Sequence, residues 1–391
     1  MPFRSKLPEV ETTIFTVISR RAAEVGALNI GQGFPDFPID PLLAQRVTEA
    51  MIEGRNQYAP GDGLVELRRA IASKLGRAHG VEADAVEGVT VTCGGTEGLF
   101  SAIQAAVHPG DEVIVFDPAY DSYEPAVRLA GGRCVRIPLL PPQFAIDWDR
   151  VRAALTPRTR LVILNNPHNP ACVVHARAVL DELAATLRGT KTLVLSDEVY
   201  EHCVFDGRKH ASVLSHPELR ERSFAVFSFG KTLHVTGWRV GCCVASPPLM
   251  REFRKVHQFN TFSIATPIQA GIARYLDDKP QAWAGLSDFF QAKRDRLLAA
   301  LAGSGFRPLP SQGTYFQLLD FSELSEASDV EFADRLIMEG GIALIPLSPF
   351  YRERPRLRLL RICVAKRDET LDLAARKLHE FTASRVRPVV A

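Results

Sequence analysis

Short apolar segments alternate with amphipathic segments between residues 87 and 244. The apolar segments read GVTVTC, DEVIVFD, LVILNN, TLVLSD, SFAVFSF and RVGCCVA. Helical patterns begin at Thr96 and cover Tyr123 to Ala130 and Ala176 to Leu187. Such alternation is typical of βαβ units around a mostly parallel sheet. The middle of the chain is therefore predicted to be an α/β domain.

The pattern changes near Trp283. A helix is predicted from Gln291 to Leu301, a strand from Tyr315 to Leu319, a helix from Val330 to Glu339, and strands at IALIP and RLLRICVA. This less regular order favours a smaller α+β domain. The expected division is an N-terminal arm with part of the small domain (1–40), a large domain (41–282) and a small C-terminal domain (283–391).

Composition and charge narrow the class of ligand. The chain has 391 residues with 46% hydrophobic and 24% charged positions, and 47 Lys and Arg against 45 Asp and Glu. This balance disfavours nucleic acid or an anionic membrane as the partner, so small molecules are expected. The seven cysteines form no CxxC or Cys/His cluster, and no metal site is predicted. With no signal peptide and no apolar run of about 20 residues, a soluble, cytoplasmic protein is expected.

Glycines and polar residues follow the predicted strands, where open α/β sheets bind ligands. They are Gly94, Gly95 and Thr96 after VTVTC, Tyr120 after VIVFD, Asn169 after VILN, Asp197 and Tyr200 after LVLS, and Lys231 after AVFS. The glycine turn opens a helix and suits a phosphate, although an ordinary turn is the alternative. It does not match the P-loop, and GQGFPD does not supply GxGxxG, which disfavours a nucleotide fold.

Two of these residues suggest chemistry. Asp197 follows an apolar run and needs a cation or several donors there, unless it only caps a helix at EVYEH. Lys231 follows another apolar strand and is a candidate nucleophilic amine, unless it is a solvated surface charge. A phosphate cradle, a carboxylate, a lysine, a tyrosine and an asparagine at neighbouring strand ends form the set that pyridoxal 5'-phosphate needs.

Nine motifs carry a resemblance to a known family: GQGFPDF, NQY, GGTEGLF, DPAYDSY, NNPHNP, SDEVYEH, SFGKTLHVTGWRVG, QGTYF and LRICVAKRDETL. Over nearly its whole length the sequence resembles the class I aminotransferases of pyridoxal-phosphate fold type I. GQGFPDF, PAYDSYEP and IPLSPFY are most similar to the kynurenine aminotransferase, glutamine transaminase K and methionine aminotransferase subgroup. One departure is that Ala171 and Cys172 follow Pro170, where family members commonly read NPxNPTG.

The resemblance implies a large domain with a mostly parallel seven-stranded sheet and a smaller α+β domain. It implies transamination in amino acid metabolism, between an L-amino acid (methionine, glutamine, aromatic or kynurenine-like) and a 2-oxo acid, by ping-pong chemistry through an aldimine on Lys231. The alternatives are a cysteine-conjugate β-lyase of the same fold and a regulator that senses pyridoxal phosphate. The regulator is disfavoured because the thirty residues before GQGFPDF leave no room for a DNA-binding domain.

The resemblance also assigns roles to the matched residues. Lys231, Asp197 and Tyr200 are the implied catalytic residues: Lys231 moves the proton, Asp197 pairs with the pyridine nitrogen, and Tyr200 binds the phenolate oxygen together with Asn169. Tyr120 stacks on the ring. The phosphate is held by Gly95, Thr96, Ser228, Arg239 and, from the neighbouring subunit, Tyr58. A homodimer with shared sites follows, in which the segment from Gln258 to Pro267 also takes part.

Substrate contacts follow in the same way. Arg361 is implied to clamp the α-carboxylate, and only the RICVAK register selects it over Arg356 and Arg358. Gly33, Phe34, Asn169, Phe15 and Tyr315 are the other implied substrate contacts. Phe15, Phe34, Tyr120, Phe262, Tyr315, Phe350 and Tyr351 form an aromatic-rich set near family pocket positions, although each also fits a plain core. Aromatic walls favour apolar or aromatic donor side chains.

Overall fold

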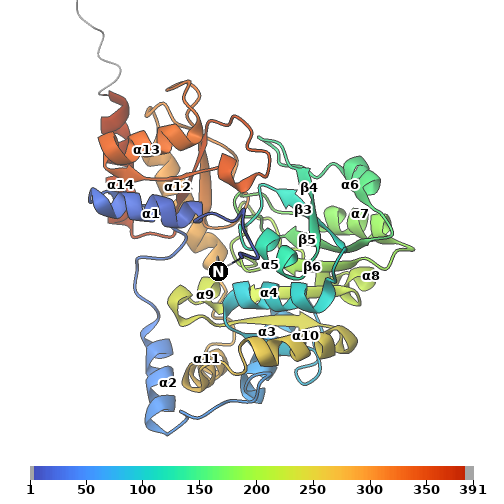
Figure 1. Ribbon diagram of the computed structural model, residues 1–391. Coiled ribbons are helices and arrows are strands. Elements are labelled where there is room, and N and C mark those ends of the chain that lie inside the picture. Colours follow the sequence, from blue (N-terminus) through green and yellow to red (C-terminus); the bar gives the residue numbers. More distant parts are fainter. Residues whose placement is uncertain (1–3, 384–391) are drawn as a thin grey trace, which may run out of the picture.

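A seven-stranded sheet forms the centre of the larger part of the molecule in the computed structural model, which describes residues 4–383 (Figure 1). Its strand order is β2-β8-β7-β6-β5-β3-β4, and β8 alone runs antiparallel to its neighbours. The strands are β2 (Val89–Thr92), β3 (Glu112–Asp117), β4 (Arg133–Pro138), β5 (Thr159–Asn165), β6 (Leu193–Asp197), β7 (Ser223–Ser228) and β8 (Gly241–Ala245). The predicted mostly parallel, seven-stranded sheet is confirmed.

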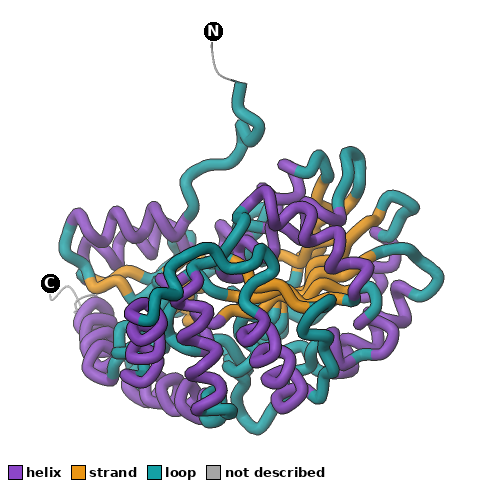
Figure 2. Tube along the Cα trace, turned by 90° about the horizontal axis from the view of Figure 1, so that it is seen from below, coloured by secondary structure: helices purple, strands orange, loops and turns teal. Residues whose placement is uncertain are grey.

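Helices cover both faces of this sheet, because its strands are apolar on both sides (Figure 2). In β3, Ile114 and Phe116 join one buried cluster, whereas Val113 and Val115 join another, as the period of two along a strand requires. The helices of this part are α2 (Pro41–Ile52), α3 (Val65–His79), α4 (Gly94–Ala106), α5 (Tyr123–Leu129), α6 (Trp148–Ala154), α7 (Arg177–Leu187), α8 (Pro217–Arg220), α9 (Phe229–Thr232), α10 (Pro247–Asn260) and α11 (Thr266–Asp278), with short 3-10 turns η1 (Val213–Ser215) and η2 (Thr236–Trp238).

The C-terminal residues form a second layer around a smaller antiparallel sheet of order β12-β13-β10-β9. Its elements are α12 (Leu286–Ala300), β9 (Arg307–Pro308), β10 (Phe316–Asp320), α13 (Asp329–Gly340), β11 (Ile342–Ala343), β12 (Ile345–Pro346), η3 (Ser348–Phe350), β13 (Leu359–Cys363) and α14 (Asp368–Ala383). The N-terminal α1 (Ile14–Glu24) and β1 (Leu28–Asn29) pack here as well, because β1 pairs with β11 in parallel. The helix α1 therefore lies in this layer together with α13 and α14, although they are about 300 residues apart in the chain (Figure 1).

Several elements differ from the sequence-based expectation. The apolar run IALIP forms two short strands, β11 and β12, which pair with different partners. The residues after Asp197 form a turn, so this carboxylate caps no helix there. The predicted division at residues 40 and 282 stays a prediction, and its outer ends, residues 1–3 and 384–391, lie outside the described residues. Within residues 4–383, no helix is long and apolar enough to cross a bilayer.

Candidate active site

One pocket collects most of the residues that follow the strands. It has a volume of about 180 Å³ and is lined by Gly95, Thr96, Leu99, Tyr120, Asn165, Asn169, Asp197, Val199, Tyr200, Ser228, Lys231 and Arg239. Every residue expected to contact the cofactor is in this set except Tyr58. Sequence reasoning missed three residues of the wall, Leu99, Asn165 and Val199, although each lies next to or within a quoted motif.

The start of α4 forms a cradle for an anion. Gly94 has φ +72°, and a Cβ added there would lie 2.6 Å from Nη2 of Arg239. Only a glycine therefore lets the Arg239 guanidinium lie against the first turn of the helix. Free N–H groups, the positive end of the helix dipole and one guanidinium together suit a phosphate dianion.

Asp197 lies at the end of β6 and is 4% exposed. Burial raises the pKa of this carboxyl to about 6, although the Tyr123 hydroxyl donates a hydrogen bond of 2.7 Å to Oδ2. The ion pairs found among residues 4–383 do not include Asp197. A buried carboxylate that has a raised pKa and no cationic partner suits a bound cation, such as a protonated ring nitrogen. Tyr123, which sequence reasoning passed over in favour of Tyr120, is therefore part of the site.

Lys231 lies in the short helix α9, directly after β7. Desolvation lowers the pKa of its ammonium to about 8, so a large share of the amine is neutral at slightly alkaline pH. Its Nζ donates to the Gly33 carbonyl at 3.3 Å and lies 5.7 Å and 5.5 Å from the ring centroids of Tyr200 and Tyr315. This environment is that of a nucleophilic or basic amine, not of a solvated surface charge.

Arg361 extends from β13 toward the same region and is 1% exposed. Its Nη1 donates to Oδ1 of Asn169 at 2.6 Å, and its Nη2 donates to the Gly31 carbonyl at 3.1 Å. Its Nε is buried and has no hydrogen-bond partner among the described residues. A carboxylate is the group that best uses such a donor. By contrast, Arg356 and Arg358 both bond to Glu326.

Of the remaining residues expected near the substrate, some lie close to Lys231 or Arg361, and one, Phe34, is exposed. Tyr315 is buried and donates from its hydroxyl to the Gly33 carbonyl at 2.6 Å, while the Phe15 and Phe350 rings lie 5.1 Å and 5.7 Å from the Arg361 guanidinium. Phe34 is 44% exposed and does not line the pocket described above.

Tyr351 and the Ala171–Cys172 turn have structural contacts. The Tyr351 hydroxyl donates to the Leu139 carbonyl at 2.8 Å. Cys172 has φ +61°, and its N–H donates to the His168 carbonyl at 2.8 Å, so the turn after Pro170 closes without a Thr-Gly pair. Burial raises the pKa of its thiol to about 12.

Tyr58 lies outside the pocket of its own chain. It is 83% exposed and packs edge-on against Phe262, which is 55% exposed, at a centroid distance of 5.2 Å. Two exposed aromatic rings in contact are a surface that favours a partner.

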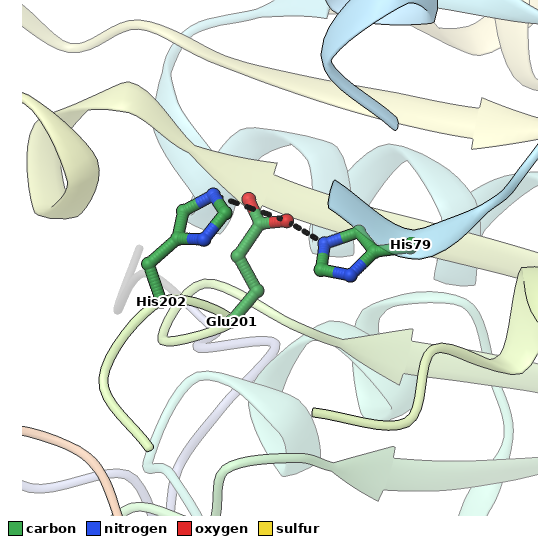
Figure 3. A group of neighbouring side chains, drawn as sticks. All are labelled: His79, Glu201 and His202. Atoms are coloured by element: carbon green, nitrogen blue, oxygen red, sulfur yellow. Dashed lines mark hydrogen bonds and ion pairs between the residues drawn. The ribbon is translucent and has the colours of Figure 1, made fainter. Parts of the chain in front are cut away.

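A buried cluster lies beside the pocket residue Tyr200 (Figure 3). The Glu201 carboxylate lies between His79 and His202: Oε2 bonds to His79 and lies 3.6 Å from Nε2 of His202. These residue types are also those of a metal site, but the other carboxylate oxygen bonds to the Lys74 ammonium. Because Lys74 balances the Glu201 charge within the chain, the cluster is a buried ion network that joins α3 to the turn after β6.

Comparison with known proteins identifies similar chains along nearly the whole length. Residues 26–378 match the family described as aminotransferase class I and II. The chain is 49% identical over 378 residues to the methionine aminotransferase of Escherichia coli (strain K12), covering 97% of this chain and 98% of that one. It is 33% identical to kynurenine–oxoglutarate transaminase 3 of Rattus norvegicus, covering 94% and 88% of the two chains.

Solved structures agree with these matches. A crystal structure from Escherichia coli, reported with a methionine aminotransferase function, superposes with a TM-score of 0.95 at 49% identity and covers 97% of this chain and all of that one. The N-succinyldiaminopimelate aminotransferase of Mycobacterium tuberculosis superposes with a TM-score of 0.93 at 38% identity, with 97% and 100% covered.

Proposed function

The chain belongs to the class I and II aminotransferases and has their fold type I architecture, and we propose that it moves the amino group of methionine, or of a donor of similar apolar character, to a 2-oxo acid. Transamination with pyridoxal 5'-phosphate is the activity of this family. The observation that carries the proposal is the contact between Arg361 and Asn169, which brings a carboxylate-binding group to the edge of the cofactor pocket.

The pocket residues fit the cofactor, and we assign them as follows. The first turn of α4 at Gly95 and Thr96, with Ser228 and Arg239, holds the phosphate, because a dianion needs several donors and a cation. Asp197 would pair with the protonated ring nitrogen, and that positive charge would lower the pKa of the buried carboxyl again.

The other contacts concern the ring itself. Asn169 and Tyr200, which line the pocket, would bind the phenolate oxygen, and Tyr120 would stack on the ring. When bound, pyridoxal 5'-phosphate supplies a carbonyl carbon that receives the amino group and a ring that withdraws electrons from the substrate Cα.

Lys231 performs the proton transfer in this assignment. Its Nζ would hold the cofactor and, once released from it, would accept the proton from the substrate Cα. The lowered pKa of about 8 favours the neutral amine that this step requires. The Tyr315 hydroxyl and the Gly33 carbonyl bond to each other and, through Gly33, to Nζ, which orients the amine.

Donor preference follows from charge. Arg361 binds the α-carboxylate, which every amino acid donor shares. Of the described residues that line the pocket, Lys231 and Arg239 are the cationic ones, and both have assigned partners. A second carboxylate on the donor would thus be desolvated without a cation, which costs several kcal/mol. Donors with apolar or neutral side chains are favoured over aspartate.

Further parts of the proposal concern assembly and location. A homodimer in which Tyr58 and the segment 258–267 complete the neighbouring site is supported by the exposed Tyr58–Phe262 pair. Residues 41–282 are assigned as the large domain, with 1–40 and 283–391 forming the arm and the small domain. All seven cysteines are free, which suits a cytoplasmic location.

A donor panel tests the proposed substrate class. Methionine, glutamine, phenylalanine, kynurenine and aspartate are assayed against several 2-oxo acids. We expect methionine or another apolar donor to have the highest kcat/KM. Aspartate ranking first would contradict the proposal, and release of pyruvate and ammonia from cysteine conjugates without an acceptor would point to the β-lyase.

A further inference from the structure

Lys366 is an unusual lysine, because its side chain is buried and yet is absent from the ion pairs found among residues 4–383. It is 2% exposed and lies between β13 and α14. Its Nζ donates to the Phe34 carbonyl at 2.6 Å and lies 4.1 Å from the centroid of the Phe34 ring. One ammonium thus binds both the backbone and the side chain of the same residue. Burying an ammonium is costly, and here a hydrogen bond and a cation–π contact, both to Phe34, offset part of that cost.

The residues around Lys366 hold the same N-terminal segment. The backbone N–H of Arg367 and the hydroxyl of Thr370 donate to the Asp36 carboxylate at 2.5 Å and 2.7 Å. On the other side of Lys366, the N–H of Cys363 donates to the Ile30 carbonyl at 2.8 Å. The segment 30–36 is therefore fixed at both ends, and Lys366 sets its middle.

That middle lies against the catalytic amine. The carbonyl of Gly33 accepts bonds from Lys231 Nζ and the Tyr315 hydroxyl, while the next carbonyl, that of Phe34, accepts from Lys366. Because adjacent carbonyls are held by separate donors, rotation of the peptide between Gly33 and Phe34 is restricted. The contact between the Lys366 ammonium and the Phe34 ring restricts the orientation of that ring as well.

We infer that Lys366 is a positioning residue for donor specificity: its buried ammonium holds the carbonyl and the ring of Phe34, and so sets the wall that receives the apolar side chain of the amino donor. This inference rests on the proposed function and on the substrate contact that the family resemblance implies for Phe34. Phe34 does not line the cofactor pocket, but it directly follows Gly33, whose carbonyl accepts from Lys231 Nζ. The side chain of alanine is a single methyl group, so kcat/KM for alanine as the amino donor should depend little on that wall. Methionine and other long apolar donors depend on it.

Lys366→Met tests the inference, since methionine keeps the length and apolar stem of lysine but removes the charge and the N–H donors. We expect kcat/KM for methionine to fall about tenfold relative to that for alanine, mainly through KM. Lys366→Arg, which keeps a cation and donors, should restore most of the ratio. In a Phe34→Leu background the ratio should respond much less to Lys366→Met, because the ring is already absent.

Lys293→Met is the matched control. Lys293 also lies over aromatic rings, at 5.5 Å from Phe37 and 5.1 Å from Phe289, but it does not contact Phe34. Its substitution should leave the methionine-to-alanine ratio unchanged. Absorbance titration with the cofactor should give the same affinity for Lys366→Met as for the parent enzyme.

An unchanged methionine-to-alanine ratio in Lys366→Met would overturn the inference, whether kcat/KM stays the same or falls equally for both donors. If Lys366→Met does not fold, Lys366→Gln, which keeps an N–H donor but loses the charge, is judged by the same ratio. A failure of the proposed function is separate, because it appears in the parent enzyme as a lack of turnover with methionine. The apolar donor that the parent uses best then replaces methionine in the ratio.

Discussion

Arg361 donates from Nη1 to Oδ1 of Asn169 at 2.6 Å, although the two residues are 192 positions apart in the chain. Arg361 comes from β13 of the smaller sheet, and Asn169 follows β5 of the larger one. The bond joins the group assigned to the substrate carboxylate with a group assigned to the cofactor. Substrate and cofactor recognition are therefore coupled through one contact.

The first prediction concerns this arginine. Arg361→Ala should lower kcat/KM by about 100-fold for methionine, glutamine and phenylalanine alike, because all share the α-carboxylate and lose the same charge-assisted bonds. Arg358→Ala, three residues earlier and paired with Glu326, is the control and should change little. Steady-state kinetics with each donor measure the effect, and a loss confined to one donor would assign Arg361 to side-chain recognition instead.

The second prediction concerns Asp197 in the enzyme with cofactor. Asp197→Asn should lose most of its turnover while keeping its fold, because a neutral amide cannot hold the ring nitrogen protonated. Circular dichroism and steady-state rates measure the two properties, with the exposed Asp149→Asn as control. Turnover close to that of the parent enzyme would remove Asp197 from the catalytic assignment.

The third prediction uses the pH dependence of the same group without cofactor. The pKa of Asp197 is raised from 3.8 to about 6, so the folded chain holds this proton more tightly than the unfolded chain. Its contribution to stability is present below about pH 4 and is lost as the pH rises through about 6. Relative to the parent, cofactor-free Asp197→Asn should therefore gain about 2.5 kcal/mol of unfolding free energy between pH 4 and pH 8. Urea titrations at the two pH values measure this gain, and a pH-independent difference would speak against it.

The fourth prediction concerns the ion network beside the pocket. Glu201→Gln should lower the unfolding free energy by about 3 to 5 kcal/mol, because it leaves the buried Lys74 ammonium without its carboxylate. The control is Glu218→Gln, which breaks the exposed pair with Arg188 and should cost at most about 1 kcal/mol. Equal costs in denaturant titrations would show that the Lys74–Glu201 pair is no more important than a surface pair.

The fifth prediction tests whether sites are shared. In a homodimer that exchanges Tyr58, mixing and reassociating Lys231→Ala chains with Tyr58→Ala chains forms mixed dimers with one native site. Activity should then rise to about a quarter of that of the parent enzyme, because half of the dimers are mixed and each has one of two sites intact. Light scattering checks the assembly. An active monomer, or a mixture no more active than its components, would contradict shared sites.

The sequence predicted the pocket well because of where its residues stand. Gly95, Asp197 and Lys231 each follow an apolar run, and the strand ends of such a sheet meet at one edge. Local pattern was enough for strands buried on both faces, such as β7. It did not single out β4, the edge strand RCVRIP, which includes Arg133 and Arg136 and is only partly buried.

Contacts between distant segments were beyond local pattern. Lys366 and Phe34 are 332 positions apart, and nothing in the sequence around either residue predicts their contact. The Tyr123 hydroxyl reaches Asp197 only because α5 packs beside the sheet. Tyr58 marks a further limit, since its assigned role requires a second chain.

The amino transfer itself is tested most directly by a single turnover. Enzyme loaded with cofactor is mixed with methionine in the absence of any 2-oxo acid, and the products are counted after rapid quenching. The account predicts one equivalent of the 2-oxo acid of methionine per active site, no free ammonia, no product in Lys231→Ala, and renewed turnover when an acceptor 2-oxo acid is added. Continuous release of ammonia without an acceptor, or no 2-oxo acid in the parent enzyme, would contradict it.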